Sequence, residues 1–220
     1  TKTWNEESVK IALKAANYSD KEIAVAGSVS TSGSWDKLSE EEIKPGFNEH
    51  LKILKEAGVD LIILEAMTSK DRTVENIIEC SKNVKLPIWL SISCAINEDE
   101  NILMHGYQES ITNSKAKFYD TLENSLSKFC KMHDGPILVA HSDIKVTGEA
   151  VKILKQIHKG IVGAYPNNGY FEKPHWKLIN DISPSNYLEE AKNWVSNGAQ
   201  IIGGCCGVGP DKINAISVLK

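Results

Sequence analysis

Two adjacent cysteines near the carboxyl end of the chain are the residues best suited to do chemistry. Cys205 and Cys206 lie within the run Gly-Gly-Cys-Cys-Gly at residues 203–207. Neighbouring cysteines are poorly spaced for an ordinary disulfide, but two thiolates on a short, glycine-rich backbone can bind one soft metal ion. The pair therefore indicates a metal site, and its ligand type favours zinc.

The predicted elements around the pair explain why a site would form there. The apolar run 199–202 predicts a buried strand, and Gly209-Pro210 predicts a helix start, because proline suits the first helical position. The thiols thus lie where a strand ends and a helix begins. The exposed N–H groups of a helix N-terminus favour thiolate over thiol.

Short apolar segments recur along the chain, and each is followed by a segment with helical periodicity. We expect six strands, over residues 23–27, 59–64, 86–91, 137–140, 161–165 and 199–202. We expect helices over residues 5–16, 45–57, 73–82, 115–132, 148–159 and 184–197, besides the one that starts at Pro210. Apolar strands alternating with amphipathic helices predict an α/β fold with a parallel sheet, either a closed barrel or an open doubly wound sheet.

Polar residues at the predicted strand ends favour the barrel. Active sites of (β/α)8 barrels lie at the carboxyl ends of the strands. Here those ends carry Gly27 with Ser28, Glu65, and His141 with Ser142, in addition to the two cysteines. No G-x-G-x-x-G or phosphate-binding loop follows a predicted strand, so the main reason to prefer a dinucleotide-binding sheet is missing.

Composition narrows the class of protein. The chain has 220 residues, 41% of them hydrophobic, and we expect a single domain over residues 1–220. A net charge of -4 gives no reason to expect attraction to nucleic acid or to an anionic membrane, so a small-molecule partner is expected. Five cysteines at irregular spacing favour a reducing compartment, the cytoplasm. The apolar runs are too short to span a bilayer.

Five motifs, in their order and spacing, resemble the homocysteine S-methyltransferase family over nearly the whole chain. They are Ala26-Gly27-Ser28, Asp60 to Glu65, Leu86 to Ser91, Tyr165 to Gly169, and Ile202 to Pro210. The resemblance implies a (β/α)8 barrel that binds zinc and transfers a methyl group from a small donor to homocysteine, forming methionine.

The resemblance also implies roles for particular residues. Cys205 and Cys206 would be two of three zinc-bound thiolates. Glu65 would pair with the amino group of homocysteine, and the backbone near Gly27 and Ser28 would lie close to the amino-acid end of that substrate. Zinc suits the reaction because it removes the proton of a bound thiol while leaving the sulfur able to attack.

The third zinc cysteine of the family is missing from its expected place. It ends an earlier strand in a Gly-x-Asn-Cys sequence, and the corresponding segment, residues 138–143, carries Ser142 instead. A neutral hydroxyl is a poor zinc ligand beside two thiolates. His141 would be a substitute, but the alternation of side chains along a strand predicts that it faces away.

The beginning of the family's barrel is missing as well. The family starts with two strands, the first carrying Asp-Gly-Gly, and residues 1–22 contain nothing similar. Six strands do not close an eight-stranded barrel. We therefore expect either residues before Thr1 or another chain, as in a homo-oligomer, to cover the open edge.

Three functions remain open. The first is a zinc-dependent methyltransferase whose donor is S-methylmethionine, a betaine-like compound or a methylfolate. The second is a zinc-poor, catalytically impaired homologue that binds an amino acid or a partner, because Ser142 stands where a cysteine is expected. The third is a subunit whose incomplete barrel is completed by a partner chain.

Overall fold

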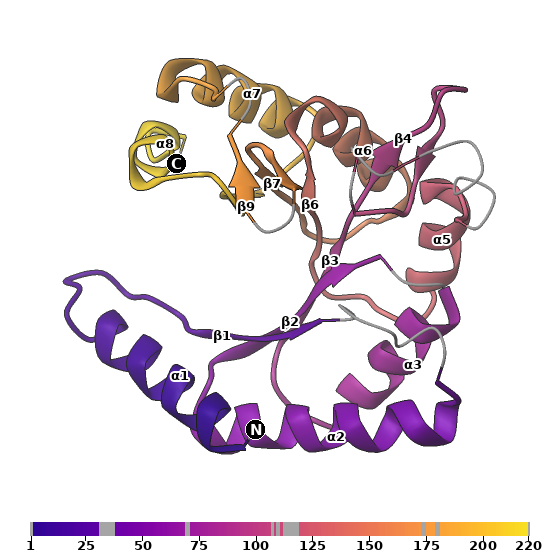
Figure 1. Ribbon diagram of the computed structural model, residues 1–220, viewed down its shortest axis with the longest axis vertical. Helices are drawn as coiled ribbons and strands as arrows, with labels where there is room; N and C mark the ends of the chain where they lie inside the picture. The colour runs from indigo at the N-terminus through magenta and orange to yellow at the C-terminus, as the bar shows by residue number, and fades with distance from the viewer. Residues whose placement is uncertain are drawn as a thin grey trace. The chain divides into compact units, whose positions relative to one another are not determined.

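The computed structural model describes residues 2–30, 38–68, 71–106, 108, 111, 119–172, 175–178 and 181–219, in which strands and helices alternate (Figure 1). The chain divides into two compact units. The N-terminal unit comprises residues 1–65 and 69–90, and the C-terminal unit comprises residues 66–68 and 91–220. A single domain over residues 1–220 stays a prediction.

Six strands form the central sheet in the order β1-β2-β3-β6-β7-β10. Their bounds are Ala26–Ser30, Leu61–Met67, Ile88–Ile92, Ile137–Asp143, Val162–Asn167 and Ile201–Ile202. The pairs β1–β2, β6–β7 and β7–β10 are parallel. All six predicted strands are confirmed, with bounds that differ by no more than three residues.

The strand order separates the two architectures that the sequence left open. Each strand joins the sheet beside the strand before it, in one continuous direction. A doubly wound sheet reverses direction at a switch point, whereas a barrel sheet does not. The winding therefore favours the barrel, and the α/β class with a parallel central sheet is confirmed. Closure into an eight-stranded barrel stays a prediction.

In the N-terminal unit, three helices lie along one face of β1 and β2 (Figure 1). They are α1 (Lys2–Ala16), α2 (Glu40–Ala57) and α3 (Asp71–Ser81). The predicted start of the second helix at Pro45 is wrong, because a capping box starts α2 earlier. The Ser39 backbone N–H donates to Oε2 of Glu42 at 2.8 Å, and the Ser39 side chain accepts from the backbone in return.

In the C-terminal unit, helices cover β6, β7 and β10. They are α5 (Leu122–Phe129), α6 (Ile144–Ile157), α7 (Pro184–Ser196) and α8 (Pro210–Ile216). The helix predicted over 115–132 is confirmed only at 122–129, since residues 119–121 and 130–132 are not helical and residues 115–118 lie outside the described residues. Asp143 starts α6 four residues before the predicted start, because its side chain accepts from Lys145 N.

Two antiparallel hairpins were not predicted. One consists of β4 (Ala95–Ile96) and β5 (Ile102–Leu103), and the other of β8 (Tyr170–Glu172) and β9 (His175–Lys177). Their strands are too short to show an alternating pattern. None of the helices in the described part of the chain is long and apolar enough to cross a bilayer.

Candidate functional site

The loop between β10 and α8, which carries both cysteines, is fastened to the end of β7. Three backbone hydrogen bonds of 2.8 to 2.9 Å make the connection: Gly203 N to Ala164 O, Cys205 N to Pro166 O, and Asn168 N to Cys206 O. The parallel pairing of β7 and β10 thus continues beyond the formal strand ends. As a result, the backbone of both cysteines is fixed relative to β7.

Two glycines allow this loop to turn tightly. Gly207 has a φ of +75°, and a Cβ at this position would collide with the backbone oxygen of Asn168. A Cβ at Gly204 would collide with the side chain of Val208. A larger residue at position 207 would therefore push the loop away from the segment after β7, and one at position 204 would displace Val208 within the loop.

His141 joins the two cysteines. One of its ring nitrogens and the sulfurs of Cys205 and Cys206 all lie within 4.8 Å of one another. The two sulfurs are 3.9 Å apart. Within the described residues, these three side chains form a group that could bind one metal ion. Two sulfurs and one imidazole nitrogen are a donor set that zinc accepts.

The prediction that His141 faces away from the cysteines is wrong, because β6 is irregular at its carboxyl end. The pairing of β6 with β7 shifts register between Ala140 and Asp143, and His141 has a φ of 50°. Ser142 turns into the core instead. Its Oγ donates to Ala140 O and accepts from Cys94 N, both at 2.8 Å. A bulge of this kind re-aims the side chains that follow it.

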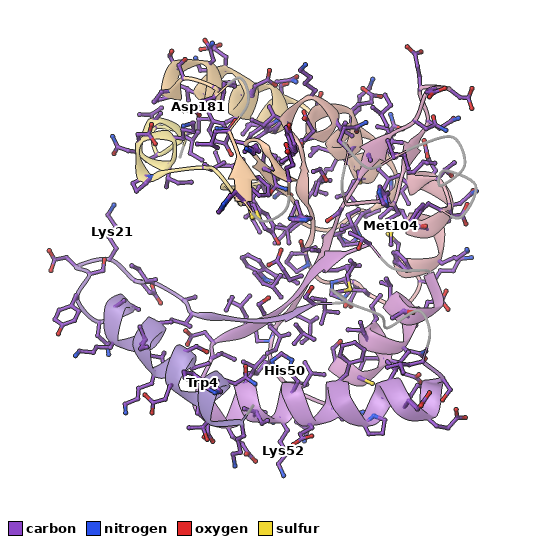
Figure 2. All side chains as sticks on the ribbon, viewed as in Figure 1. Trp4, Lys21, His50, Lys52, Met104 and Asp181 are labelled. Carbon is purple, nitrogen blue, oxygen red and sulfur yellow. The ribbon has the colours of Figure 1, made fainter. Side chains whose placement is uncertain are left out.

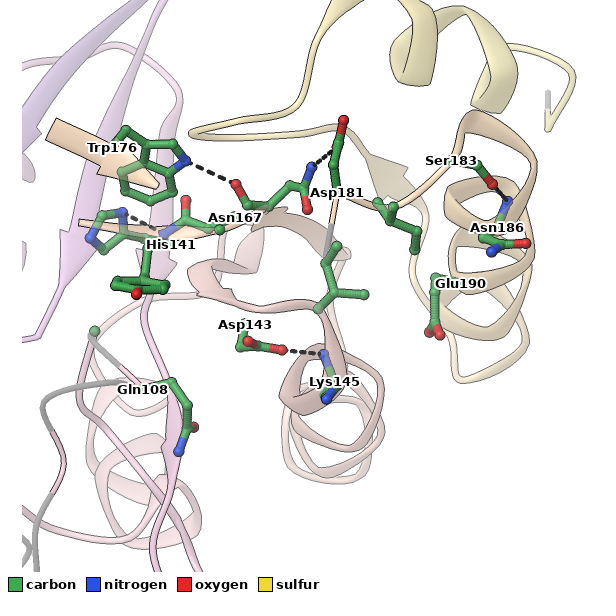
Figure 3. Close-up of a pocket in the computed structure, with 16 residues that line it drawn as sticks. Gln108, His141, Asp143, Lys145, Asn167, Trp176, Asp181, Ser183, Asn186 and Glu190 are labelled. Atoms are coloured by element: carbon green, nitrogen blue, oxygen red, sulfur yellow. Dashed lines mark hydrogen bonds between the residues drawn. The ribbon is translucent and has the colours of Figure 1, made fainter. Parts of the chain in front are cut away.

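Asn167 connects His141 to the cysteine loop. Its Oδ1 accepts from Cys206 N at 3.2 Å, and its Nδ2 lies 3.3 Å from Nδ1 of His141 (Figure 3). The side chain is buried, and these two contacts orient its carboxamide. In the sequence, Asn167 was only part of the motif at residues 165–169, and nothing indicated which of its side chains makes these contacts.

A second amide links the loop to α8. Asn168 Nδ2 donates to Asp181 Oδ1 at 2.6 Å and to Gly207 O at 3.3 Å. Asp181 also pairs with the buried Lys212 of α8 at 3.1 Å. Hydrogen bonds from Lys212 and then Asn168 lower the pKa of the Asp181 carboxyl. No sequence signal marked this network, because its members are far apart along the chain.

The electrostatics of the site favour a thiolate. The pKa of Cys206 lies well below its usual range, first because Cys205 donates a hydrogen bond to its sulfur and second because His141 does so, with partial burial opposing both. Tyr187 of α7 stabilises the loop, because its hydroxyl donates a hydrogen bond to Gly203 O at 2.7 Å. Burial, and then the charge of Cys205, raise the pKa of Tyr187, so it stays a neutral donor.

A pocket of about 590 Å³ lies beside His141 and Asn167 (Figure 3). Its walls come from the start of α6, the end of β7 with the following hairpin, and the start of α7. Trp176 lines the pocket, with its indole N–H donating to Asn168 O at 2.9 Å. The charged side chains that line it are Asp143, Lys145, Asp181 and Glu190. A cavity of this volume accommodates a small organic molecule.

The predicted contacts to the amino-acid end of a substrate lie on β1 and β2, in the N-terminal unit. Glu65 is half-buried on β2 and pairs in register with Ser30 of β1. Gly27 and Ser28 lie inside β1 rather than at its end, because the strand runs three residues further than predicted. A Cβ at Gly27 would lie 3.1 to 3.2 Å from the side chains of Ile62, Leu54 and Val59, so this glycine allows close packing. The substrate-binding role of all three stays a prediction.

Comparison with known proteins identifies relatives. Residues 1–219 match the sequence model of a family described as homocysteine S-methyltransferase. Homocysteine S-methyltransferase 3 of Zea mays is 29% identical over 198 residues, which cover 84% of this chain and 52% of the maize protein. Selenocysteine methyltransferase of Astragalus bisulcatus is 23% identical over 215 residues, which cover 88% of this chain and 58% of the Astragalus protein. The chain thus spans little more than half the length of these relatives.

The fold is also similar to a solved structure. The crystal structure of the homocysteine methyltransferase MmuM from Escherichia coli in its apo form superposes with a TM-score of 0.71 at 19% identity. The superposition covers 100% of this chain and 74% of that one. The metallated form of MmuM matches with a TM-score of 0.70 at 18% identity.

Proposed function

Because the chain belongs to the homocysteine S-methyltransferase family, we propose that it transfers a methyl group from a small donor to the thiolate of homocysteine, forming methionine. The observation that carries this proposal is the pair of cysteines held at the carboxyl end of the sheet, next to a pocket that is lined in part by charged side chains. Methyl transfer to sulfur needs a thiolate acceptor. The loop that carries Cys205 and Cys206 favours the ionised form of sulfur, as the lowered pKa of Cys206 indicates.

The residues present fit a zinc ion. Cys205 and Cys206 offer two soft sulfur donors 3.9 Å apart, and the lowered pKa of Cys206 favours the form that binds metal. Both thiols are at least partly accessible. When bound, zinc lowers the pKa of a substrate thiol and holds the resulting thiolate in place. Cys205 and Cys206 are therefore the proposed metal ligands.

The chain's other residues would position the reactants. The hydrogen bonds from Tyr187 and the end of β7 hold the cysteine loop still, so the acceptor sulfur would be presented in one place. The pocket beside His141 is large enough for a small methyl donor. Its lining contains more carboxylates than lysines, which suits a donor that carries positive charge better than one that carries several negative charges.

Glu65 is the proposed contact for the amino group of homocysteine. A half-buried carboxylate on a strand is a suitable partner for an ammonium group. Gly27 and Ser28 are proposed to contact the amino-acid end of homocysteine. Ser28 is exposed on β1 and would use its side chain, whereas Gly27 would use only its backbone, since a Cβ there would crowd its neighbours. This part of the proposal rests on the resemblance of these motifs to the family.

The test is methionine formation by the zinc-loaded protein from homocysteine and, in turn, S-methylmethionine, a betaine and a methylfolate, followed by mass spectrometry. We expect one donor to support turnover. Glu65→Gln should raise the KM for homocysteine and leave zinc affinity unchanged, whereas Glu56→Gln, on the exposed side of α2, should change neither. Absence of methionine with every donor, from protein that binds zinc, would contradict the proposed activity.

The alternative of a zinc-poor homologue predicts homocysteine binding without transfer. It depended on Ser142 as the residue facing the metal. Ser142 is buried and uses its hydroxyl in two hydrogen bonds within the core, so its identity says little about the metal site. We therefore favour the enzyme.

A further inference from the structure

His141 is the side chain beside the cysteines to which the proposed function assigns no role. A ring nitrogen lies within 4.8 Å of both sulfurs, and the ring also lines the pocket (Figure 3). The residue takes a φ of 50°, a conformation that residues with side chains rarely adopt. Such strain persists only where the surroundings hold a side chain in a particular place, and it gathers at functional sites.

We propose that His141 is the third protein ligand of the metal, so that two thiolates and one imidazole replace the three thiolates that the family resemblance implies. The inference rests on the proposed function for the presence of a metal and adds the identity of a ligand. Two cysteines and a histidine are an established donor set for a catalytic zinc with one open position. The open position is left for the thiolate of the substrate.

The neighbouring serine cannot take this place. Ser142 is buried, its Oγ donates to Ala140 O, and the same oxygen accepts from Cys94 N. To face the cysteines, it would have to break both hydrogen bonds and leave the Cys94 N–H unpaired in the core. The register shift between β6 and β7 therefore decides which of the two adjacent residues meets the metal.

Asn167 is the positioning residue for the imidazole. Its Oδ1 accepts from Cys206 N, so its Nδ2 faces Nδ1 of His141. Two N–H groups do not face each other, so in this arrangement Nδ1 accepts from Asn167 and Nε2 is the ring nitrogen left for the metal. A neutral imidazole that binds a metal through Nε2 carries its one ring proton on Nδ1, so Asn167 would then present its oxygen to Nδ1 and give up the hydrogen bond from Cys206 N.

One consequence concerns the net charge of the metal site. A neutral imidazole in place of a thiolate leaves the zinc site with one negative charge fewer. Two thiolates balance the charge of Zn²⁺, so the site becomes negative only when the substrate thiolate binds. This should ease the entry of a thiolate into the open position compared with a site of three cysteines.

Cobalt substitution tests the ligand set without relying on activity. Co²⁺ in a zinc site shows sulfur-to-metal charge-transfer bands whose intensity follows the number of bound thiolates, and its visible bands respond to geometry and donor type. For the wild-type protein without homocysteine we expect the intensity of two thiolates. His141→Ala should keep that intensity but lower Co²⁺ and Zn²⁺ affinity at least about 10-fold. His141→Cys should give the intensity of three thiolates.

Ser142→Cys is the matched control, because it places the same new thiol one residue further along. We expect neither the charge-transfer intensity nor the affinity to rise. A rise for Ser142→Cys, with none for His141→Cys, would overturn the inference. X-ray absorption of the zinc-loaded wild type is a second measurement that does not depend on the folding of either variant, and it should show two sulfur neighbours and one imidazole.

The outcomes separate this inference from the proposed function. If His141→Ala leaves metal affinity and the cobalt spectrum unchanged while Cys206→Ala loses the metal, the imidazole only donates a hydrogen bond to a thiolate. The third-ligand assignment is then wrong and the methyltransferase proposal stands. If the wild type binds neither Co²⁺ nor Zn²⁺, both the ligand assignment and the proposed metal are wrong.

Discussion

Cys206 and Cys94 show one functional group in two opposite environments of the C-terminal unit. Cys206 is exposed, and its pKa is lowered by hydrogen bonds from Cys205 and His141. Cys94 is fully buried, and burial raises the pKa of its thiol to about 12. Two successive residues of β6 take part in these environments, His141 beside Cys206 and Ser142 beside Cys94.

The surroundings of a cysteine, rather than its residue type, therefore decide how readily its thiol ionises. In the core, the loss of water disfavours the thiolate of Cys94, the charge of Glu123 adds to this effect, and a hydrogen bond from Ser142 offsets it only in part. At the loop, neighbouring donors stabilise the negative sulfur while water still reaches it. Figure 2 draws the side chains on the ribbon, with sulfur in yellow. Cys206 and Cys94 have the same functional group and differ in what surrounds it.

The largest expected effect is in thiol reactivity at pH 6. The thiolate is the reactive form, and a thiol with a pKa near 9 is only about 0.1% ionised at this pH. Because its pKa is lowered, Cys206 of the metal-free protein should stay largely ionised, while Cys94 should be almost fully protonated. We expect iodoacetamide to label Cys206 at least about 100-fold faster than Cys94, as measured by peptide mass spectrometry.

The pH profile sharpens this comparison. An ordinary thiol loses reactivity about tenfold for each pH unit below its pKa. The labelling rate of Cys206 should instead change little between pH 8 and pH 6 and fall only when the pH drops through its lowered pKa. A tenfold decline per unit over that range would show that Cys206 is an ordinary thiol.

Cys206→Ala and Cys94→Ala should have opposite consequences. Removal of the exposed Cys206 should reduce zinc affinity at least about 100-fold and abolish turnover, with a change in unfolding free energy within about 0.5 kcal/mol. Removal of the buried Cys94 should cost about 1 kcal/mol of unfolding free energy and leave zinc affinity unchanged. Chelator competition and urea unfolding measure the two quantities, and a loss of zinc from Cys94→Ala would break the comparison.

Ser142→Ala should destabilise the protein by about 1 to 3 kcal/mol, because it leaves the buried Cys94 N–H without an acceptor. Ser93→Ala is the matched control. Ser93 is equally buried, but its Oγ has no hydrogen-bond partner in the described part of the chain, so its removal should cost much less. Urea unfolding of the two variants gives the difference, and equal losses would contradict the role assigned to Ser142.

The smallest expected effect is at the outer support of the cysteine loop. Asp181→Ala removes a partner of both Asn168 and Lys212, so Gly207 should lose part of its support and zinc affinity should fall about 10-fold. Asp211→Ala removes the other carboxylate near Lys212, at 3.7 Å, without touching Asn168. Chelator competition should show almost no change for Asp211→Ala, and equal losses would assign the effect to the charge of Lys212 alone.

Much of the fold could be predicted because its signals are local. Apolar runs and helical periodicity depend on residues a few positions apart, and in the described part of the chain they marked the six central strands and six of the seven helices, while proline marked the start of α8. The errors were local too. At the start of α2, a capping box outweighed the preference of proline for the first turn, and the two hairpins were too short for a pattern.

The sequence by itself determined that two cysteines stand on a glycine-rich turn after a strand, and that this turn resembles a metal-binding motif. It also supplied Glu65, Gly27 and Ser28 as candidates, whose roles stay predictions. Only the tertiary structure decided between His141 and Ser142 as the neighbour of those cysteines. That choice depends on a register shift between β6 and β7, and on Asn167 meeting Cys206 across 39 residues of chain. Strand alternation describes a regular ladder, and no local pattern reveals where pairing with another strand interrupts it.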